Sequence, residues 1–206
     1  MTQPVPTSSD LLSGPAPDPS AFEAIPGFLA PEEGQALYRA AKLWPGLGPV
    51  VEVGSFKGRS TCWLAQGVKD RGQGIVLAVD HFQGSAEHQN LDEVKSGQLL
   101  SNFALNLASA GLLPYINILP MHSGRAATIY AQRPARLIFI DASHDEGSVS
   151  DDYYAWEDHL LPFAGVAFHD VGPWDGPTRL YDKLTREYRL REIASVGTLR
   201  IAARTL

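Results

Sequence analysis

Short apolar runs, rich in β-branched residues, recur along this chain and alternate with stretches of helical periodicity. The runs span residues 49–53, 75–79, 116–119, 137–140 and 166–168. Because nearly every position in them is apolar, they are typical of strands that are covered on both faces. Their alternation with helices predicts parallel βαβ units, and therefore an α/β fold with helices on both faces of the sheet.

Three further elements complete the expected fold. Apolar residues recur at helical spacing after Pro31, which predicts a leading helix before the sheet. A start that resembles a capping box at Ser148 predicts a later helix. Near the C-terminus, residues 188–196 and 198–203 flank Gly197 and predict a closing antiparallel pair.

The chain length bounds the number of domains. A chain of 206 residues is long enough for one well-buried domain but short for two. Residues 1–20 are rich in Pro, Ser, Thr and Asp and have no apolar period, so they bury too little surface to offset the entropy of ordering. We therefore expect a disordered N-terminal arm over 1–20 and a single domain over 21–206.

Charge and composition exclude several classes of partner. With 17 basic and 23 acidic side chains, the net charge of −6 disfavours nucleic acid and anionic membranes. There is no apolar run of about 18 residues, and the first basic residue is Arg39, so neither a membrane span nor a signal peptide is expected. These features predict a cytoplasmic protein. The single cysteine, Cys62, lies in an apolar run and is interpreted as a packing residue.

The most informative motif is a glycine loop over residues 50–61, with the sequence VVEVGSFKGRST. It reads as a strand, a turn flanked by Gly54 and Gly58, and the start of a helix, whose unpaired N–H groups can bind an anion such as a carboxylate. Three residues separate the glycines, unlike the Gly-x-Gly-x-x-Gly spacing that wraps a pyrophosphate. Because an acid, Glu52, precedes the first glycine, the loop suits a ligand with an amino-acid end and a positive centre.

An acid follows the next predicted strand. Residues 75–79 carry no charge, and Asp80 comes directly after them. A carboxylate at that edge can accept both hydroxyls of a ribose, so the loop and Asp80 together predict a nucleoside-binding site. The alternative is that Gly54 and Gly58 only form a tight turn and that Asp80 only caps the next element.

From about residue 50 to its C-terminus, the chain resembles the class I S-adenosylmethionine-dependent methyltransferases, and more narrowly the branch that modifies sugars and small natural products. The resemblance is carried by four segments: EVGSFKG (52–58), VDHFQGSAEH (79–88), LIFIDASH (137–144) and residues 160–170, which end in His-Asp. One departure is Phe163-Ala164-Gly165, where the family usually has Pro-Gly-Gly. The resemblance implies a Rossmann-like, seven-stranded, mostly parallel sheet with an antiparallel last strand, and methyl transfer to an oxygen or nitrogen of a small molecule.

The same resemblance implies where S-adenosylmethionine binds. It places Glu52, Gly54 and Ser55 near the methionine end, Asp80 at the ribose, and His81 and Ser123 beside the adenine, although simple surface roles stay open for the last two. The full set of expected cofactor-binding residues is Glu52, Gly54, Ser55, Gly58, Ser60, Asp80, His81, Ser123 and Asp141.

A hydroxyl acceptor must lose a proton as it attacks the methyl group, which a general base or a metal ion can arrange. The expected catalytic residues are His144, Asp141 and Asp170, with His144 as the base. A second hypothesis is a divalent metal, Mg²⁺ or another, held by Asp141, His169 and Asp170, although histidine is a poor Mg²⁺ ligand. Alternatively, Asp141 contacts the cofactor, Asp170 contacts the substrate and no metal binds. His144 could also merely cap its loop.

Other functions and partners remain open at this stage. A nicotinamide-dependent oxidoreductase on a similar sheet is disfavoured because Gly-x-Gly-x-x-Gly is missing. A catalytically silent cofactor-binding subunit and non-methyl chemistry on the same fold are further alternatives. Trp174, in the Pro-rich loop 171–177, either lines the acceptor pocket or pins that loop to the body. A homodimer with the arm docked across its interface is also left open.

Overall fold

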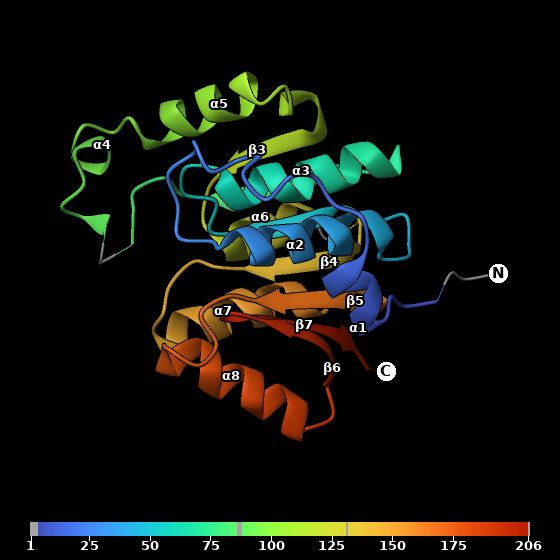
Figure 1. Cartoon of the computed structure of the whole chain (residues 1–206). Helices are drawn as coiled ribbons and strands as arrows, with labels where there is room; N and C mark the ends of the chain where they lie inside the picture. Colours follow the sequence, from blue (N-terminus) through green and yellow to red (C-terminus); the bar gives the residue numbers. More distant parts are fainter. Residues whose placement is uncertain (1–3, 86–87, 131, 206) are drawn as a thin grey trace.

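The computed structural model describes residues 4–85, 88–130 and 132–205, and a seven-stranded sheet runs through its middle (Figure 1). The strands are β1 (Val50–Val53), β2 (Val76–Asp80), β3 (Ile116–Pro120), β4 (Ala135–Ile140), β5 (Leu160–Phe168), β6 (Leu190–Val196) and β7 (Leu199–Arg204). Their order is β3-β2-β1-β4-β5-β7-β6. The first five strands are parallel, and β7 runs antiparallel to both β5 and β6. The expected sheet, with its antiparallel C-terminal pair, is confirmed.

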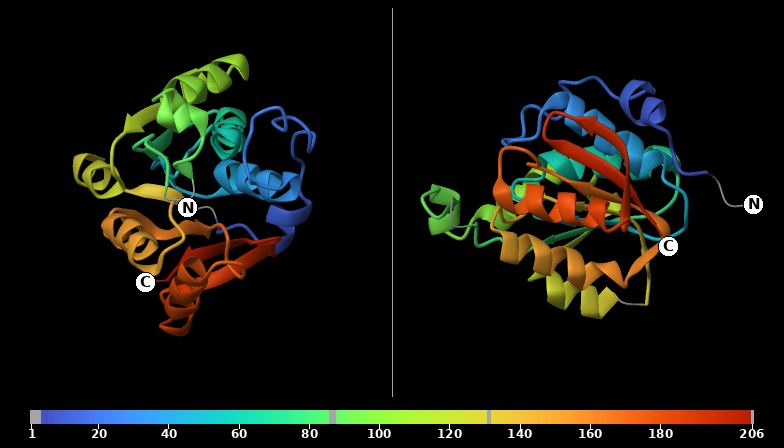
Figure 2. Two further views of the ribbon diagram at one scale, coloured as in Figure 1. Left: turned by 90° about the vertical axis from the view of Figure 1, so that its left-hand side faces the viewer. Right: turned by 90° about the horizontal axis from the view of Figure 1, so that it is seen from below.

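Two layers of helices cover the sheet (Figure 2). The helices are α1 (Ser8–Ser13), α2 (Pro31–Leu43), α3 (Arg59–Arg71), α4 (Asp92–Lys95), α5 (Leu99–Ser109), α6 (Ser123–Tyr130), α7 (Glu146–Glu157) and α8 (Asp175–Arg186). In β4, Leu137 and Phe139 pack with the layer of α2, α3 and α5, whereas Ile138 and Ile140 pack with α6, α7 and α8. This alternation follows from the two-residue period of a strand and explains why the run is apolar at every position.

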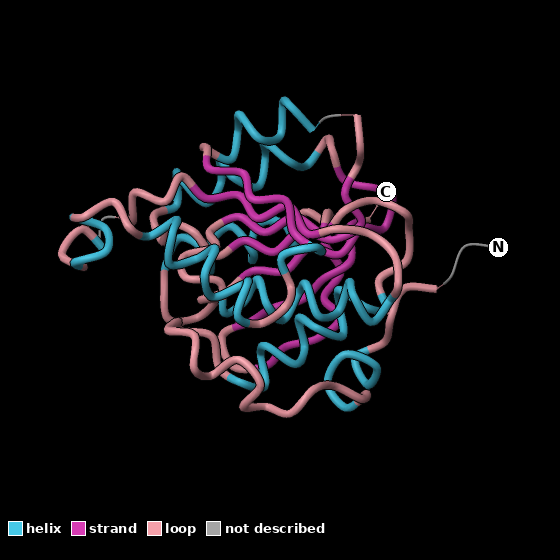
Figure 3. The backbone as a smooth tube through the Cα atoms, turned by 90° about the horizontal axis from the view of Figure 1, so that it is seen from above, coloured by secondary structure: helices cyan, strands magenta, loops and turns pink. Residues whose placement is uncertain are grey.

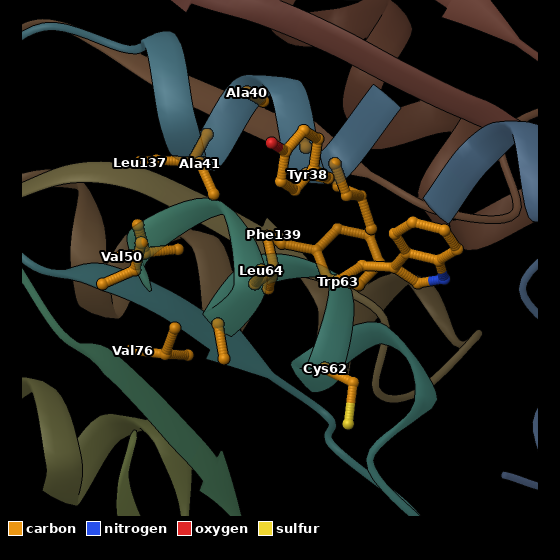
Figure 4. Close-up of a cluster of buried hydrophobic side chains, with 14 of the residues drawn as sticks. Tyr38, Ala40, Ala41, Val50, Cys62, Trp63, Leu64, Val76, Leu137 and Phe139 are labelled. Atoms are coloured by element: carbon orange, nitrogen blue, oxygen red, sulfur yellow. The ribbon is translucent and has the colours of Figure 1, made fainter. Parts of the chain in front are cut away.

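Figure 4 shows part of the core between α2, α3 and the sheet. Cys62 is fully buried there beside Trp63 and Leu64, and burial raises the pKa of its thiol to about 12. The interpretation of Cys62 as a packing residue is therefore confirmed. Burying a side chain such as Leu64 contributes roughly 1.5–3 kcal/mol relative to leaving it in water.

The carboxyl ends of the five parallel strands meet at one edge of the sheet, because parallel strands share a direction. The segment that contains α4 projects from the body at this edge (Figures 1 and 3). The same edge carries the glycine loop after β1, Asp80 at the end of β2, Asp141 after β4 and His169 after β5. The fold thus places side chains from distant parts of the sequence next to one another.

The N-terminal segment differs from the disordered arm that its composition predicts. Among its described residues, 4–20, α1 forms a short helix and Leu11 is fully buried. The guanidinium of Arg39 in α2 donates hydrogen bonds to the carbonyls of Leu11, Leu12 and Gly14. Composition could not reveal this packing, because it depends on one leucine and on an arginine from another element.

Two boundaries also differ from the expectations. Helix α7 begins at Glu146, and the Asp145 carboxylate caps it by accepting a hydrogen bond from the Ser148 backbone N–H at 2.9 Å. Strand β5 begins at Leu160 rather than at 166, because the segment expected to be a turn continues the strand through an irregularity in its pairing with β4. Phe163, in that segment, adopts a positive φ of 60°. No helix among the described residues is long and apolar enough to cross a membrane.

Candidate functional site

A cavity of about 500 Å³ opens at the carboxyl edge of the sheet. Five of the nine expected cofactor-binding residues line it: Gly54, Asp80, His81, Ser123 and Asp141. The other four do not line the cavity and belong to the glycine loop or to the strand and helix that flank it. Of the segment 79–88, residues 86 and 87 lie outside the described residues.

The glycine loop is shaped by close backbone contacts. Gly54 has a φ of 85°, and a Cβ atom at this position would lie 2.1 Å from the carbonyl oxygen of Asp141. Gly58 has a φ of 94° and precedes α3, where a Cβ atom would lie 3.1 Å from the ring of Phe103. Both positions therefore require glycine, and Gly54 allows the loop after β1 to approach the end of β4.

Glu52 does not line the cavity but holds the glycine loop through hydrogen bonds in the protein interior. Its fully buried carboxylate accepts hydrogen bonds at Oε2 from the hydroxyls of Ser55, at 2.8 Å, and Thr61, at 2.5 Å. Its Oε1 atom has no hydrogen-bond partner among the described residues. Burial raises the pKa of Glu52 to about 7. Ser60 is buried in the first turn of α3, so its expected contact with the cofactor would be indirect.

Asp80 lines the cavity and also holds the loop. Its Oδ2 atom accepts hydrogen bonds from the backbone N–H groups of Ser55 and Phe56, at 3.0 and 2.9 Å, and its Oδ1 atom accepts one from Phe82 at 2.7 Å. A carboxylate offers about four acceptor sites, so these three bonds leave room for one strong contact to a ribose. Asp80 thus holds the shape of the glycine loop and presents its remaining acceptor site to the cavity.

One end of the cavity lies between the strand ends and helix α7. The rings of His81 and His122 lie 4.9 Å apart there, and Ser123 lies beside them. Asp152 from α7 also lines this end. The sequence reasoning missed His122 and Asp152, because neither directly follows a strand and only the packing of α7 beside α6 brings Asp152 to the cavity.

A second cluster, on the loops after β4 and β5, contains the expected catalytic residues. The Nε2 atom of His144 lies 2.9 Å from Oδ2 of Asp170, and the indole of Trp174 stacks on the His144 ring at 4.2 Å with an interplanar angle of 17°. Asp170 has a positive φ of 59°. Burial raises the pKa of Asp170, but hydrogen bonds from His144 and His169 outweigh it and hold this pKa well below its usual range. The carboxylate is therefore ionised and orients His144.

His169 faces three carboxylates. Its Nδ1 atom lies 3.2 Å from Asp141 and 3.3 Å from Asp170, and its Nε2 atom lies 3.1 Å from Glu33 in α2. Burial alone would lower the pKa of His169, but hydrogen bonds to the three carboxylates raise it to about 12. Sequence reasoning missed Glu33, because no local signal connects the first turn of α2 with the end of β5.

The residues expected to bind a metal fit that role only in part. Both nitrogens of His169 face carboxylate oxygens, which only accept hydrogen bonds, so this ring has no lone pair to offer a metal. A different set, Asp141, His144 and Asp170, places one potential ligand atom from each residue within 4.8 Å of the others. Two carboxylates and one imidazole could hold a divalent cation, with His144 in place of the expected His169.

Three aromatic rings stack together at one part of the cavity lining. Phe56 and His88, which line it, stack at 4.7 Å, and Phe28 stacks on both rings although 78% of it is exposed. Trp174, which stacks on His144, is 42% exposed and does not line this cavity. Exposed aromatic side chains beside a cleft are typical of binding sites for organic molecules.

The seven-stranded sheet, the glycine loop and the acid at the end of β2 define a Rossmann-like fold of the class I S-adenosylmethionine-dependent methyltransferases. The sequence model of a methyltransferase domain matches residues 51–171, which is more than half of the chain. The chain therefore belongs to this methyltransferase family.

Solved structures of similar fold support this assignment at the level of architecture. An O-methyltransferase from Bacillus cereus in complex with SAH is 19% identical with a TM-score of 0.66, and the match covers 96% of this chain and 94% of that chain. The O-methyltransferase TomG from Streptomyces achromogenes, involved in tomaymycin synthesis and solved with SAM, is 18% identical with a TM-score of 0.64, covering 100% and 92%. A methyltransferase from Geobacter sulfurreducens is 17% identical with a TM-score of 0.63, covering 93% and 92%.

Proposed function

We propose that this methyltransferase transfers the methyl group of S-adenosylmethionine to a hydroxyl of a sugar or natural product, with His144 as the general base. The observation that carries this proposal is the 2.9 Å contact between His144 and the ionised Asp170 at the carboxyl edge of the sheet. Two of the three similar structures described above are O-methyltransferases, and one of these is involved in tomaymycin synthesis, which favours an oxygen acceptor of this kind.

The charge of the cavity supports the proposed cofactor over a dinucleotide. Its described lining contains the carboxylates of Asp80, Asp141, Asp151 and Asp152 but no Lys or Arg side chain. Such a lining attracts a sulfonium and an ammonium group and repels a pyrophosphate. This observation also disfavours the nicotinamide-dependent oxidoreductase, whose cofactor carries two phosphates.

The chain's contribution to the reaction is to position the reactants and to remove a proton. S-adenosylmethionine supplies the methyl group, so a C–O bond forms as the C–S bond breaks and the sulfonium becomes a thioether. Neutral His144 donates Nε2–H to Asp170 and takes the hydroxyl proton at Nδ1. Asp170 and the stacked Trp174 then stabilise the imidazolium.

A metal-assisted version of the same reaction is the second candidate, because Asp141, His144 and Asp170 can converge on one cation. These three residues would hold it, and it would supply a lowered pKa for a bound acceptor hydroxyl. In that case His144 would be a ligand rather than the base. A catalytically silent subunit is less well supported, since the His144–Asp170 pair is intact.

Binding and turnover measurements test the proposal in sequence. Calorimetry with S-adenosylmethionine comes first, and the absence of binding would refute the proposed cofactor. Turnover is then followed as S-adenosylhomocysteine release with a panel of sugar and phenolic hydroxyl acceptors, with and without EDTA.

We expect His144→Ala to lower turnover by about 10²–10⁴-fold without changing cofactor affinity, and EDTA to have no effect. His159→Ala, on the connection between α7 and β5, is the matched control and should retain activity. Loss of activity in EDTA that Mg²⁺ or Mn²⁺ restores would favour the metal-assisted version instead.

A further inference from the structure

Helix α7 carries two adjacent acidic residues in its interior, Asp151 and Asp152, and they differ in environment. Both line the cavity described above, but Asp151 is exposed whereas Asp152 is half-buried. Aspartate is among the less favourable residues in a helix interior, and burying its charge costs further free energy. Because nothing in the proposed catalytic cluster uses Asp152, its placement calls for another explanation.

The surroundings of Asp152 give it a defined orientation. Ser123, at the start of α6, is buried, and its hydroxyl oxygen accepts a hydrogen bond from Nε1 of Trp156 at 3.0 Å. The Ser123 hydroxyl therefore keeps its own proton for another acceptor, and its interaction with the Asp152 side chain lowers the pKa of that carboxyl. Even when the Ser123 hydroxyl donates to it, the Asp152 carboxylate keeps further acceptor sites for a ligand in the cavity.

The charge state of Asp152 fits an acceptor role near neutral pH. Burial raises its pKa to about 6, although the hydrogen bond from Ser123 lowers it. The carboxylate is thus mostly ionised at pH 7.5, where it can only accept hydrogen bonds.

We propose that Asp152 selects the adenine base of the cofactor by accepting a hydrogen bond from its exocyclic amine. This inference rests on the proposed function, in which the ribose lies at Asp80 and the adenine lies between His81 and Ser123. Asp152 is the carboxylate at that end of the cavity that contacts Ser123, and Ser148, one helical turn earlier, lines the same wall. Adenine offers an amine donor at this edge, whereas hypoxanthine offers a carbonyl oxygen that an acceptor-only carboxylate repels.

A carboxylate should discriminate strongly between the two bases, because hypoxanthine would place its carbonyl oxygen, a second acceptor, against the Asp152 carboxylate. A hydrogen bond to a charged group corresponds to roughly 10- to 100-fold in affinity. The protein should therefore bind S-adenosylhomocysteine about 10- to 100-fold more tightly than S-inosylhomocysteine, which differs only in carrying hypoxanthine.

The test measures the affinity ratio of these two ligands by calorimetry at pH 7.5. In Asp152→Asn, the side-chain amide can donate to the hypoxanthine oxygen, so the preference for S-adenosylhomocysteine should fall to about twofold or reverse. Asp152→Ala, which can neither donate nor accept, should bring the ratio close to one and provides a second variant if the first does not fold. Asp158→Asn removes the same charge from an exposed position at the end of the same helix, outside the cavity lining, and should keep the wild-type ratio.

The outcomes distinguish failure of the proposed function from failure of the role proposed for Asp152. If wild-type protein binds neither ligand, the proposed function fails, and this inference fails with it. If it binds both ligands and Asp152→Asn keeps the wild-type ratio, Asp152 does not read the base. Equal loss of the preference in Asp158→Asn and Asp152→Asn would indicate a general effect of charge and would also refute the assignment.

Discussion

Glu33 and His169 are 136 residues apart in the sequence, yet Oε2 of Glu33 lies 3.1 Å from Nε2 of His169 in the buried interior. The same carboxylate accepts hydrogen bonds from the backbone N–H of Ala30 at 2.9 Å and from that of Thr198 at 2.7 Å. Glu33 therefore joins the leading helix, the end of β5 and the turn between β6 and β7. Through His169 it also contacts the carboxylate of Asp141 at the candidate site.

We expect Glu33→Gln to destabilise the protein by about 1.5–3 kcal/mol, because the buried His169 ring loses its charge-assisted hydrogen bond at Nε2 while Asp141 and Asp170 still face its Nδ1 atom. Thermal unfolding measures this loss. Glu32→Gln, at the exposed neighbouring position, is the control and should unfold at the wild-type temperature. Equal stability of the two variants would show that the contact between Glu33 and His169 contributes no net stability.

A second prediction concerns the N-terminal segment. Leu11 is fully buried, whereas Leu12 is 37% exposed, so the two leucines form a matched pair. We expect Leu11→Ala to cost about 2–5 kcal/mol of unfolding free energy and Leu12→Ala to cost less than about 1 kcal/mol. Chemical denaturation of both variants checks this difference. If the segment is disordered in solution, neither substitution will change the stability.

The sheet was predictable from the sequence because buried parallel strands are apolar at nearly every position. Val50–Val53 and Val76–Asp80 lie within one residue of the expected runs. The first half of Leu160–Phe168 was not predictable, since Pro162 and exposed positions interrupt its pattern. Helix α1 was missed because six residues are too few to show a period.

The site was predictable where functional residues lie at or just after the end of a strand. Asp80 ends β2, Asp141 directly follows β4 and Asp170 lies two residues after β5, so the fold class alone brings them to one edge. The role of Glu33 depends on how α2 packs against the end of β5, and that of Asp152 depends on how α7 packs beside α6. No local sequence pattern indicates either of these two helix packings.

The raised pKa of Glu52 predicts a specific pH dependence of stability. This carboxyl has a pKa of about 7 in the folded protein against an ordinary value of 4.5, so between these pH values the folded state holds a proton that the unfolded state has released. The corresponding stability is fully present below pH 4.5 and is lost as the pH rises to about 7. The loss amounts to at most about 1.4 kcal/mol per pH unit for one proton.

Comparison with Glu52→Gln isolates this contribution, because the amide cannot ionise. The difference in unfolding free energy, wild type minus variant, should fall between pH 4.5 and 7 and then level off. Glu23→Gln, at an exposed position, should show no such trend. A difference that stays constant across this range would mean that Glu52 titrates normally in the folded protein.

The last prediction follows from the two roles of Asp80. Its carboxylate accepts three backbone N–H groups, two of them in the glycine loop, and also lines the cavity. Asp80→Asn replaces one acceptor oxygen with a donor that faces backbone N–H groups, so the loop should lose its shape. We expect S-adenosylmethionine affinity to fall by at least about tenfold and the melting temperature to fall as well, since hydrogen bonds to a charged group contribute about 1.5–3 kcal/mol each.

Calorimetry and thermal unfolding measure the two effects, with exposed Asp182→Asn as the control. A variant with normal stability but weakened binding would assign Asp80 to the ligand alone. Normal affinity in a destabilised variant would remove Asp80 from the cofactor site and leave it with a purely structural role.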